Sequence, residues 1–85
     1  MLSLDMSKQA VKFLKELPAK QFKQLGVKIL ELLQNPTPND YSKPKGYESL
    51  YRVDVGEYRI VYEFDKLFLN VLLVDHRNDD AVYKA

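Results

Sequence analysis

The stretch YRVDVGEYRIVYEF, residues 51–64, decides the fold of this chain. Apolar and polar side chains alternate with a period of two on both sides of Gly56 and Glu57, which predicts antiparallel strands over 50–55 and 58–64. Gly56 occupies the first central position of the connection, where glycine fits a type II′ turn. The stretch therefore predicts a β-hairpin with a tight two-residue turn.

The flanking sequence predicts two further strands and a helical hairpin. After a turn at Asp65-Lys66, residues 67–74 are almost wholly apolar, so we expect them to form the central strand. Residues 2–6 alternate as in a short strand. Residues 8–17 and 18–34 carry apolar side chains at helical spacing and lysines on their outer faces. In the second helix the predicted apolar face comprises Phe22, Leu25, Ile29, Leu32 and Leu33.

The order β-α-α-β-β-β predicts an α+β fold. Neither layer can bury its apolar side alone, so the helical hairpin must pack on one face of a mostly antiparallel four-stranded sheet. The other face is then partly open, and a functional site is expected there. With 85 residues, the chain has room for one domain, 1–85.

Composition limits the function classes. Thirteen basic and twelve acidic residues give a net charge of +1, which argues against broad nonspecific coating of nucleic acid. The absence of cysteine excludes disulfides and a thiol nucleophile. No apolar run reaches membrane-spanning length and the N-terminus lacks the apolar core of a signal peptide, so we expect a cytoplasmic protein without membrane contact.

All three arginines, Arg52, Arg59 and Arg77, lie in the second half of the chain. Arginine suits planar, two-pronged contacts with phosphate, so the pattern points to an anionic ligand. Burying an unpaired arginine is costly, and pairing with a carboxylate such as Asp54 or Glu63 is the alternative interpretation. We expect no cofactor, and the acidic residues around His76 are typical of a polar strand end rather than of a metal site.

The run Tyr51–Glu63, followed by VLLVDHR at 71–77 and then Val82-Tyr83, resembles the RelE/ParE family of bacterial toxins over essentially the whole chain. The resemblance implies a RelE-like, microbial RNase-like fold. It also implies a metal-independent endoribonuclease that enters the ribosomal A site and cleaves mRNA there, thereby inhibiting translation. In this reaction the ribose 2′-OH attacks the adjacent phosphate. A cognate antitoxin that blocks the site in a hetero-oligomer is implied as the partner.

The resemblance also implies roles for individual residues. Arg59 would bind the phosphate and stabilise developing charge, Arg77 would contact the scissile phosphate, and Tyr83 would transfer a proton or stack on a base. Arg52 keeps a basic residue where RelE-type enzymes often have one. Asp54 departs from the pattern, because members with two basic residues in this strand would carry the second one there.

Two interpretations of Asp54 stay open: it could serve as a carboxylate base, or it could form an ion pair with Arg59. Further RNA contacts are implied for Lys43, Lys45 and His76, with solvated loop lysines and an exposed strand-end histidine as the alternatives. A ParE-type inhibitor of DNA gyrase shares the fold and is the main competing function. A catalytically weakened member that survives as an interaction protein is the third.

Overall fold

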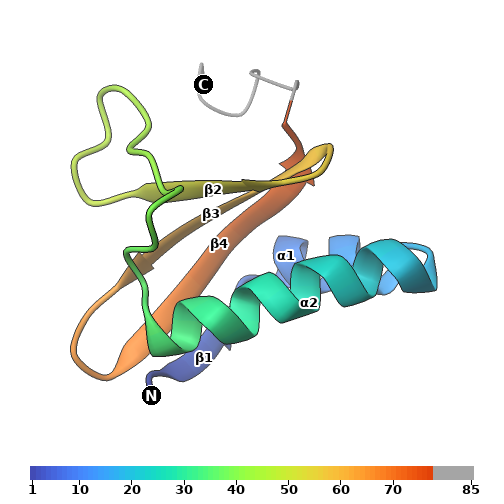
Figure 1. The fold of residues 1–85 in the computed structure, drawn as a ribbon, viewed down its shortest axis with the longest axis horizontal. Helices are drawn as coiled ribbons and strands as arrows, with labels where there is room; N and C mark the ends of the chain where they lie inside the picture. The colour runs from blue at the N-terminus through green and yellow to red at the C-terminus, as the bar shows by residue number, and fades with distance from the viewer. Residues whose placement is uncertain (78–85) are drawn as a thin grey trace.

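The computed structural model describes residues 1–77 and contains the predicted elements in the predicted order (Figure 1). These are β1 (Ser3–Met6), α1 (Lys8–Lys15), α2 (Ala19–Gln34), β2 (Tyr51–Val55), β3 (Tyr58–Phe64) and β4 (Phe68–His76). Within residues 1–77, no helix is long and apolar enough to cross a membrane.

The four strands form one sheet in the order β1-β4-β3-β2. β4 lies between β1, with which it is parallel, and β3, with which it is antiparallel, so the predicted central position of the apolar strand is confirmed. The hairpin turn is also confirmed. Gly56 has a φ of 59°, whereas no non-glycine residue described has a positive φ, as a type II′ turn at Gly56-Glu57 requires.

Both helices cover the same face of the sheet and enclose the core (Figure 1). Leu25, Ile29 and Leu32 of α2 pack there with Ile60 and Val74 from the two central strands. The predicted apolar face of α2 is correct except at Phe22, whose side chain is 50% exposed. Phe22 lies in the first turn of α2, where its ring lines a surface groove instead of the core.

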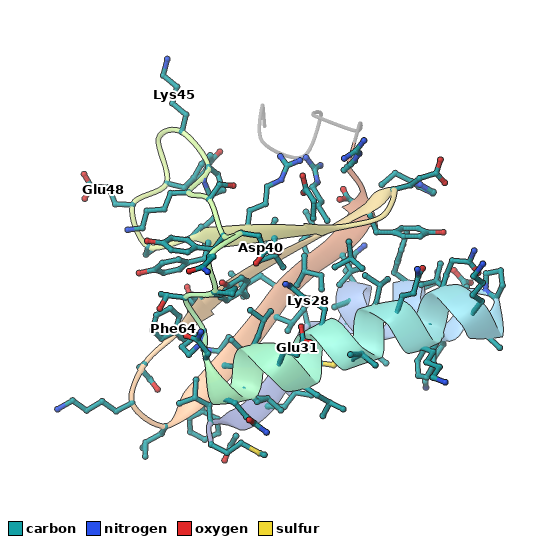
Figure 2. All side chains as sticks on the ribbon, in the orientation of Figure 1. Lys28, Glu31, Asp40, Lys45, Glu48 and Phe64 are labelled. Atoms are coloured by element: carbon teal, nitrogen blue, oxygen red, sulfur yellow. The ribbon has the colours of Figure 1, made fainter. Side chains whose placement is uncertain are left out.

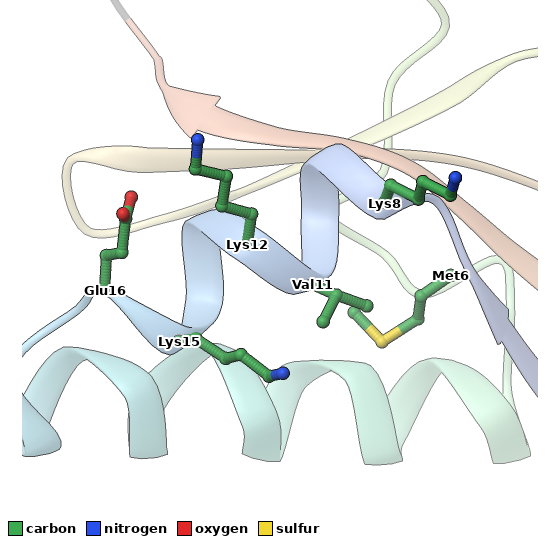
Figure 3. A pocket seen from close by; sticks show the side chains of 6 residues that line it. All are labelled: Met6, Lys8, Val11, Lys12, Lys15 and Glu16. Carbon is green, nitrogen blue, oxygen red and sulfur yellow. The ribbon is translucent and has the colours of Figure 1, made fainter.

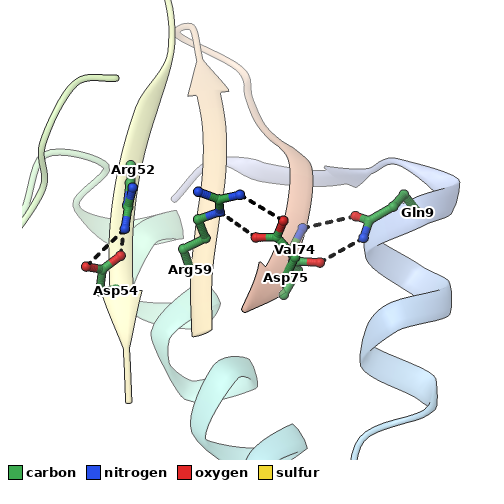
Figure 4. A network of polar contacts seen from close by, with 6 residues as sticks. All are labelled: Gln9, Arg52, Asp54, Arg59, Val74 and Asp75. Carbon is green, nitrogen blue, oxygen red and sulfur yellow. Dashed lines mark hydrogen bonds and ion pairs between the residues drawn. The ribbon is translucent and has the colours of Figure 1, made fainter. Parts of the chain in front are cut away.

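Side chains of α1 complete the backbone pairing of β4. β1 ends at Met6, opposite Val71, so the backbone groups of β4 beyond that point have no strand partner on this edge. The Ser7 hydroxyl caps α1 by accepting the Ala10 N–H at 3.0 Å, and it donates to the Leu72 carbonyl at 2.7 Å. Two residues further, the Gln9 amide both donates to and accepts from the backbone of Val74, at 2.8 and 3.0 Å (Figure 4). The segment of β4 that precedes Asp75 is therefore clamped to α1.

Candidate functional site

Four charged side chains gather on the sheet face opposite the helices: Arg52 and Asp54 from β2, Arg59 from β3 and Asp75 from β4 (Figure 4). The strand register causes this arrangement, because Arg59 lies across from Asp54 on one side and from Asp75 on the other. Cross-strand partners project to the same face, which makes these residues neighbours. The expected site on the face away from the helices is thus a row of alternating charges.

Arg59 and Asp75 form a buried ion pair. Arg59 Nε donates to Asp75 Oδ1 at 2.5 Å, and Arg59 Nη2 donates to Asp75 Oδ2 at 3.0 Å. The Arg59 side chain is fully buried, and that of Asp75 is 12% exposed. A buried guanidinium needs a carboxylate that is also shielded from water, and Asp75 on the central strand meets that need better than Asp54 near the edge. The considered ion pair between Asp54 and Arg59 is therefore wrong.

Asp54 pairs with Arg52, two residues earlier on the same strand. Arg52 Nε donates to Asp54 Oδ1 at 2.9 Å, and Arg52 Nη2 reaches Asp54 Oδ2 at 3.5 Å. The two side chains are 23% and 42% exposed. Both sheet arginines thus contact a carboxylate through two nitrogens, but only the Arg52–Asp54 pair lies at the surface.

Arg77 follows β4 directly and lies at the same end of the sheet. Its backbone N–H donates to the Glu57 carbonyl at 2.9 Å, which ties the end of β4 to the β2–β3 turn, and its side chain is exposed. The register thus brings Arg77 to the end of the sheet that carries Arg59 and Asp75. Tyr83, which is expected to transfer a proton or stack on a base, lies outside the described residues 1–77.

His76 lies on the helix side of the sheet. Its ring centroid is 5.1 Å from that of Tyr58 and 5.9 Å from that of Phe13 in α1, the latter in an edge-to-face arrangement. The sheet therefore separates His76 from Arg59 and Asp75, and the structure does not bring it into the arginine row. Its expected RNA contact stays a prediction.

Lys43 and Lys45 lie in the loop between α2 and β2. Two backbone hydrogen bonds of 2.8 Å between Ser42 and Arg52 fasten this loop to the edge of β2. The Lys43 ammonium donates to the Glu48 carbonyl at 2.9 Å and lies 4.8 Å from the centroid of the Tyr51 ring. Lys45 projects from the loop tip into solvent (Figure 2). Only Lys45 is thus presented without a contact that positions it.

The same loop is anchored to the body of the protein at two points. The buried Tyr62 hydroxyl donates to the Pro36 carbonyl at 2.6 Å, and burial raises the pKa of Tyr62 well above its usual value. The ammonium of Lys28 in α2 bonds Asp40 Oδ2 at 2.8 Å, and this bond lowers the Asp40 pKa (Figure 2). Tyr62 therefore stays protonated and serves as an anchor.

A second surface feature lies on the helix side, in an apolar groove of about 440 Å³ between α1, α2 and β1. Phe22, Leu30 and Leu4 line it and are 50%, 60% and 43% exposed. Next to it, a shallow pocket shares Met6, Val11 and Lys15 with the groove and is also lined by Lys8, Lys12 and Glu16 (Figure 3). The result is an apolar surface bordered by three lysines and one glutamate.

Sequence reasoning missed the role of Asp75, which it treated as part of a polar strand end. The signal that could have found it is the pairing of Arg59 with Asp75, which lie 16 positions apart in the chain. Finding this pairing requires the register between β3 and β4. Within residues 1–77, no three His, Asp or Glu side chains lie close enough together to hold a metal ion.

Comparison with known proteins decides the family. Residues 4–81 match the family model described as the ParE toxin of type II toxin–antitoxin systems (parDE). This chain belongs to the RelE/ParE toxin family. The resemblance inferred from the hairpin and the strand that follows it is therefore confirmed, and the protein is a toxin of a toxin–antitoxin system of the RelE/ParE type.

Relatives of this RelE/ParE toxin agree in sequence and fold. A protein of Methanocaldococcus jannaschii, named as a candidate toxin RelE1, is 33% identical over 63 residues, which make up 71% of this chain and 70% of the relative. The isolated RelE toxin of E. coli superposes with a TM-score of 0.79 at 26% identity, covering 99% of this chain and 93% of the other. RelE in the archaeal RelE–RelB complex of Pyrococcus horikoshii superposes with a TM-score of 0.78 at 26% identity, covering 91% and 96%.

Proposed function

We propose that this toxin is a ribosome-dependent endoribonuclease that cleaves mRNA in the A site. The observation that carries the proposal is that Arg52, which is partly exposed, and Arg59 lie on one sheet face, with the exposed Arg77 at the end of the same sheet. Attack of a ribose 2′-OH on the adjacent phosphate builds negative charge on the phosphoryl oxygens, and fixed cations stabilise such charge in the transition state.

The exposed arginines are suited to direct contact with RNA. Arg77 is assigned to the scissile phosphate and Arg52 to a neighbouring phosphate. Arg59 is buried and paired with Asp75, so it supports the face from within, and its expected direct phosphate contact stays a prediction. Asp54 carries the one carboxylate of the row that is substantially exposed and is the candidate base, while Tyr83 stays the candidate proton donor to the leaving 5′-oxygen.

Dependence on the ribosome follows from the charge of the face. Arg52 and Arg59 each carry an aspartate partner, so the row can neutralise few phosphates at once. Affinity for free RNA comes mainly from neutralised phosphates and the counterions they release, so free RNA is bound weakly. A substrate held in place by the ribosome removes the need for strong binding by the toxin itself.

The apolar groove is proposed as the docking site of the cognate antitoxin. Exposed apolar side chains and the adjoining lysines fit an amphipathic helix with acidic residues along the borders of its apolar face. Toxins of the same fold have been crystallised as RelE–RelB complexes, including that of Methanococcus jannaschii, which is 31% identical to this chain over 93% of its length with a TM-score of 0.71. A toxin–antitoxin hetero-oligomer is the expected resting form.

Primer extension on translated mRNA after induction tests the proposed activity. We expect cuts within A-site codons that disappear in the Arg77→Ala and Tyr83→Phe variants, both of which should still bind the antitoxin. Intact mRNA accompanied by gyrase-dependent DNA damage would instead establish the ParE-type function, which the matched family model favours. Growth without arrest in the absence of antitoxin would indicate a weakened member.

A further inference from the structure

We propose that Asp54 limits the affinity of this toxin for RNA by occupying the guanidinium of Arg52, so that Arg52 must leave Asp54 to bind a phosphate. This inference rests on the proposed function insofar as the ligand of the arginine row is RNA. Asp54 would thereby act as a specificity-determining residue that suppresses binding to free RNA.

The geometry makes Asp54 a direct competitor of phosphate. Arg52 presents Nε and Nη2 to the two carboxylate oxygens of Asp54, at 2.9 and 3.5 Å. The same two-nitrogen edge of a guanidinium binds two oxygens of a phosphate. Carboxylate and phosphate therefore require the same donors and cannot both hold this edge at once.

The pair is also weak enough to exchange. The side chains are 23% and 42% exposed, and the longer of the two contacts lies at the limit of a hydrogen bond. Exposed ion pairs contribute about 0–1 kcal/mol, so a phosphate can displace Asp54. The Arg59–Asp75 pair differs on both counts. Its contacts are 2.5 and 3.0 Å long, and its arginine is fully buried, so breaking the pair is strongly destabilising.

The position of Asp54 strengthens its effect. Asp54 lies directly across from Arg59 in the β2–β3 register, so its negative charge faces both arginines of the hairpin. Glu57, in the turn of the same hairpin, is exposed and has no ion pair among residues 1–77. Glu57→Gln therefore changes the net charge by the same amount without releasing Arg52, and it serves as the matched control.

The test measures equilibrium binding of the full-length toxin to a short single-stranded 2′-O-methyl RNA. This RNA cannot be cleaved, because its 2′-OH groups are blocked. Binding is measured by fluorescence anisotropy over a series of KCl concentrations. We expect Asp54→Asn to tighten binding about threefold to fivefold at low salt, as a surface pair of up to about 1 kcal/mol allows. The slope of log K against log salt should become more negative by about 0.7, one additional phosphate contact on a single strand. Glu57→Gln should change the affinity for RNA less than about twofold, because the exposed Glu57 charge acts on RNA only through solvent and is screened by salt.

A double-mutant cycle separates release of Arg52 from a simple charge effect. In an Arg52→Ala background, Asp54→Asn should tighten binding no more than Glu57→Gln does. A larger gain that persists there, or an Asp54→Asn effect no larger than that of Glu57→Gln in the wild-type background, overturns the inference. If the wild-type toxin cleaves mRNA on ribosomes while Asp54→Asn does not bind RNA more tightly, this inference fails and the proposed function stands. If no variant binds RNA at any salt concentration and ribosomal mRNA stays intact, both fail.

Discussion

Arg59 and Asp75, 16 residues apart in the chain, form a buried ion pair through two hydrogen bonds across the central strands β3 and β4. The adjoining Gln9 clamp holds the β4 backbone at Val74, immediately before Asp75. The carboxylate that neutralises Arg59 is therefore held from two sides. This pair anchors the sheet face on which Arg52 is presented, and β4 leads directly from Asp75 to Arg77.

Replacing Asp75 by asparagine should destabilise the protein strongly. The substitution removes the carboxylate charge that meets the buried Arg59 guanidinium, and breaking a buried pair costs about 3–5 kcal/mol in comparable cases. Urea denaturation measures the free energy of unfolding. Asp54→Asn breaks the chemically similar pair at the surface and should cost less than about 1 kcal/mol. Equal losses in the two variants would contradict the assigned burial of Arg59.

Arg77→Ala should remove activity without unfolding the protein. The Arg77 side chain is exposed, and the hydrogen bond to Glu57 uses the backbone, so the substitution leaves the fold intact. Loss of one cation that stabilises transition-state charge typically lowers the rate by about 10²–10³-fold. Single-turnover cleavage of mRNA on programmed ribosomes, together with a thermal melt, measures both quantities. Full activity in a folded Arg77→Ala protein would remove this residue from the site.

Leu30→Glu should weaken antitoxin binding and leave the toxin folded. Leu30 is 60% exposed in the apolar groove, so the glutamate is not buried in the free toxin, but a docked helix would bury it. Titration calorimetry with the antitoxin should show at least about tenfold weaker binding. Leu67→Glu is the control, because Leu67 is 69% exposed in the β3–β4 turn and does not line the groove. Equal weakening by both substitutions would place the antitoxin elsewhere.

The Lys28–Asp40 bond should make a small contribution to stability that depends on pH. The hydrogen bond from Lys28 lowers the Asp40 pKa below its ordinary value of 3.8, so the stabilisation is fully present above that value and is lost as pH falls through the lowered pKa. Because the Asp40 side chain is 52% exposed, the contribution is below about 1 kcal/mol. Urea denaturation at pH 7 and pH 3 should show that Asp40→Asn loses stability at the higher pH and little at the lower one. A larger loss at pH 3 would reverse the assigned sign.

The sequence by itself determined the order of elements, the hairpin turn, the central strand and the family. These depend on local features, namely side-chain periodicity, the glycine at position 56 and a motif that is contiguous over Tyr51–Glu63. The sequence also placed the arginines on strands of one small sheet, which was sufficient to indicate an anionic ligand.

Only the tertiary structure decided which charges meet and which side chains face solvent. Arg59 pairs with Asp75 rather than Asp54 because strand order and register place a shielded carboxylate beside it. His76 lies on the helix side and Phe22 lines a groove because packing of the helices, and not local periodicity, sets which surface is covered. Pairing and burial are properties of contacts between distant segments, so they become defined only when the sheet and helices are assembled.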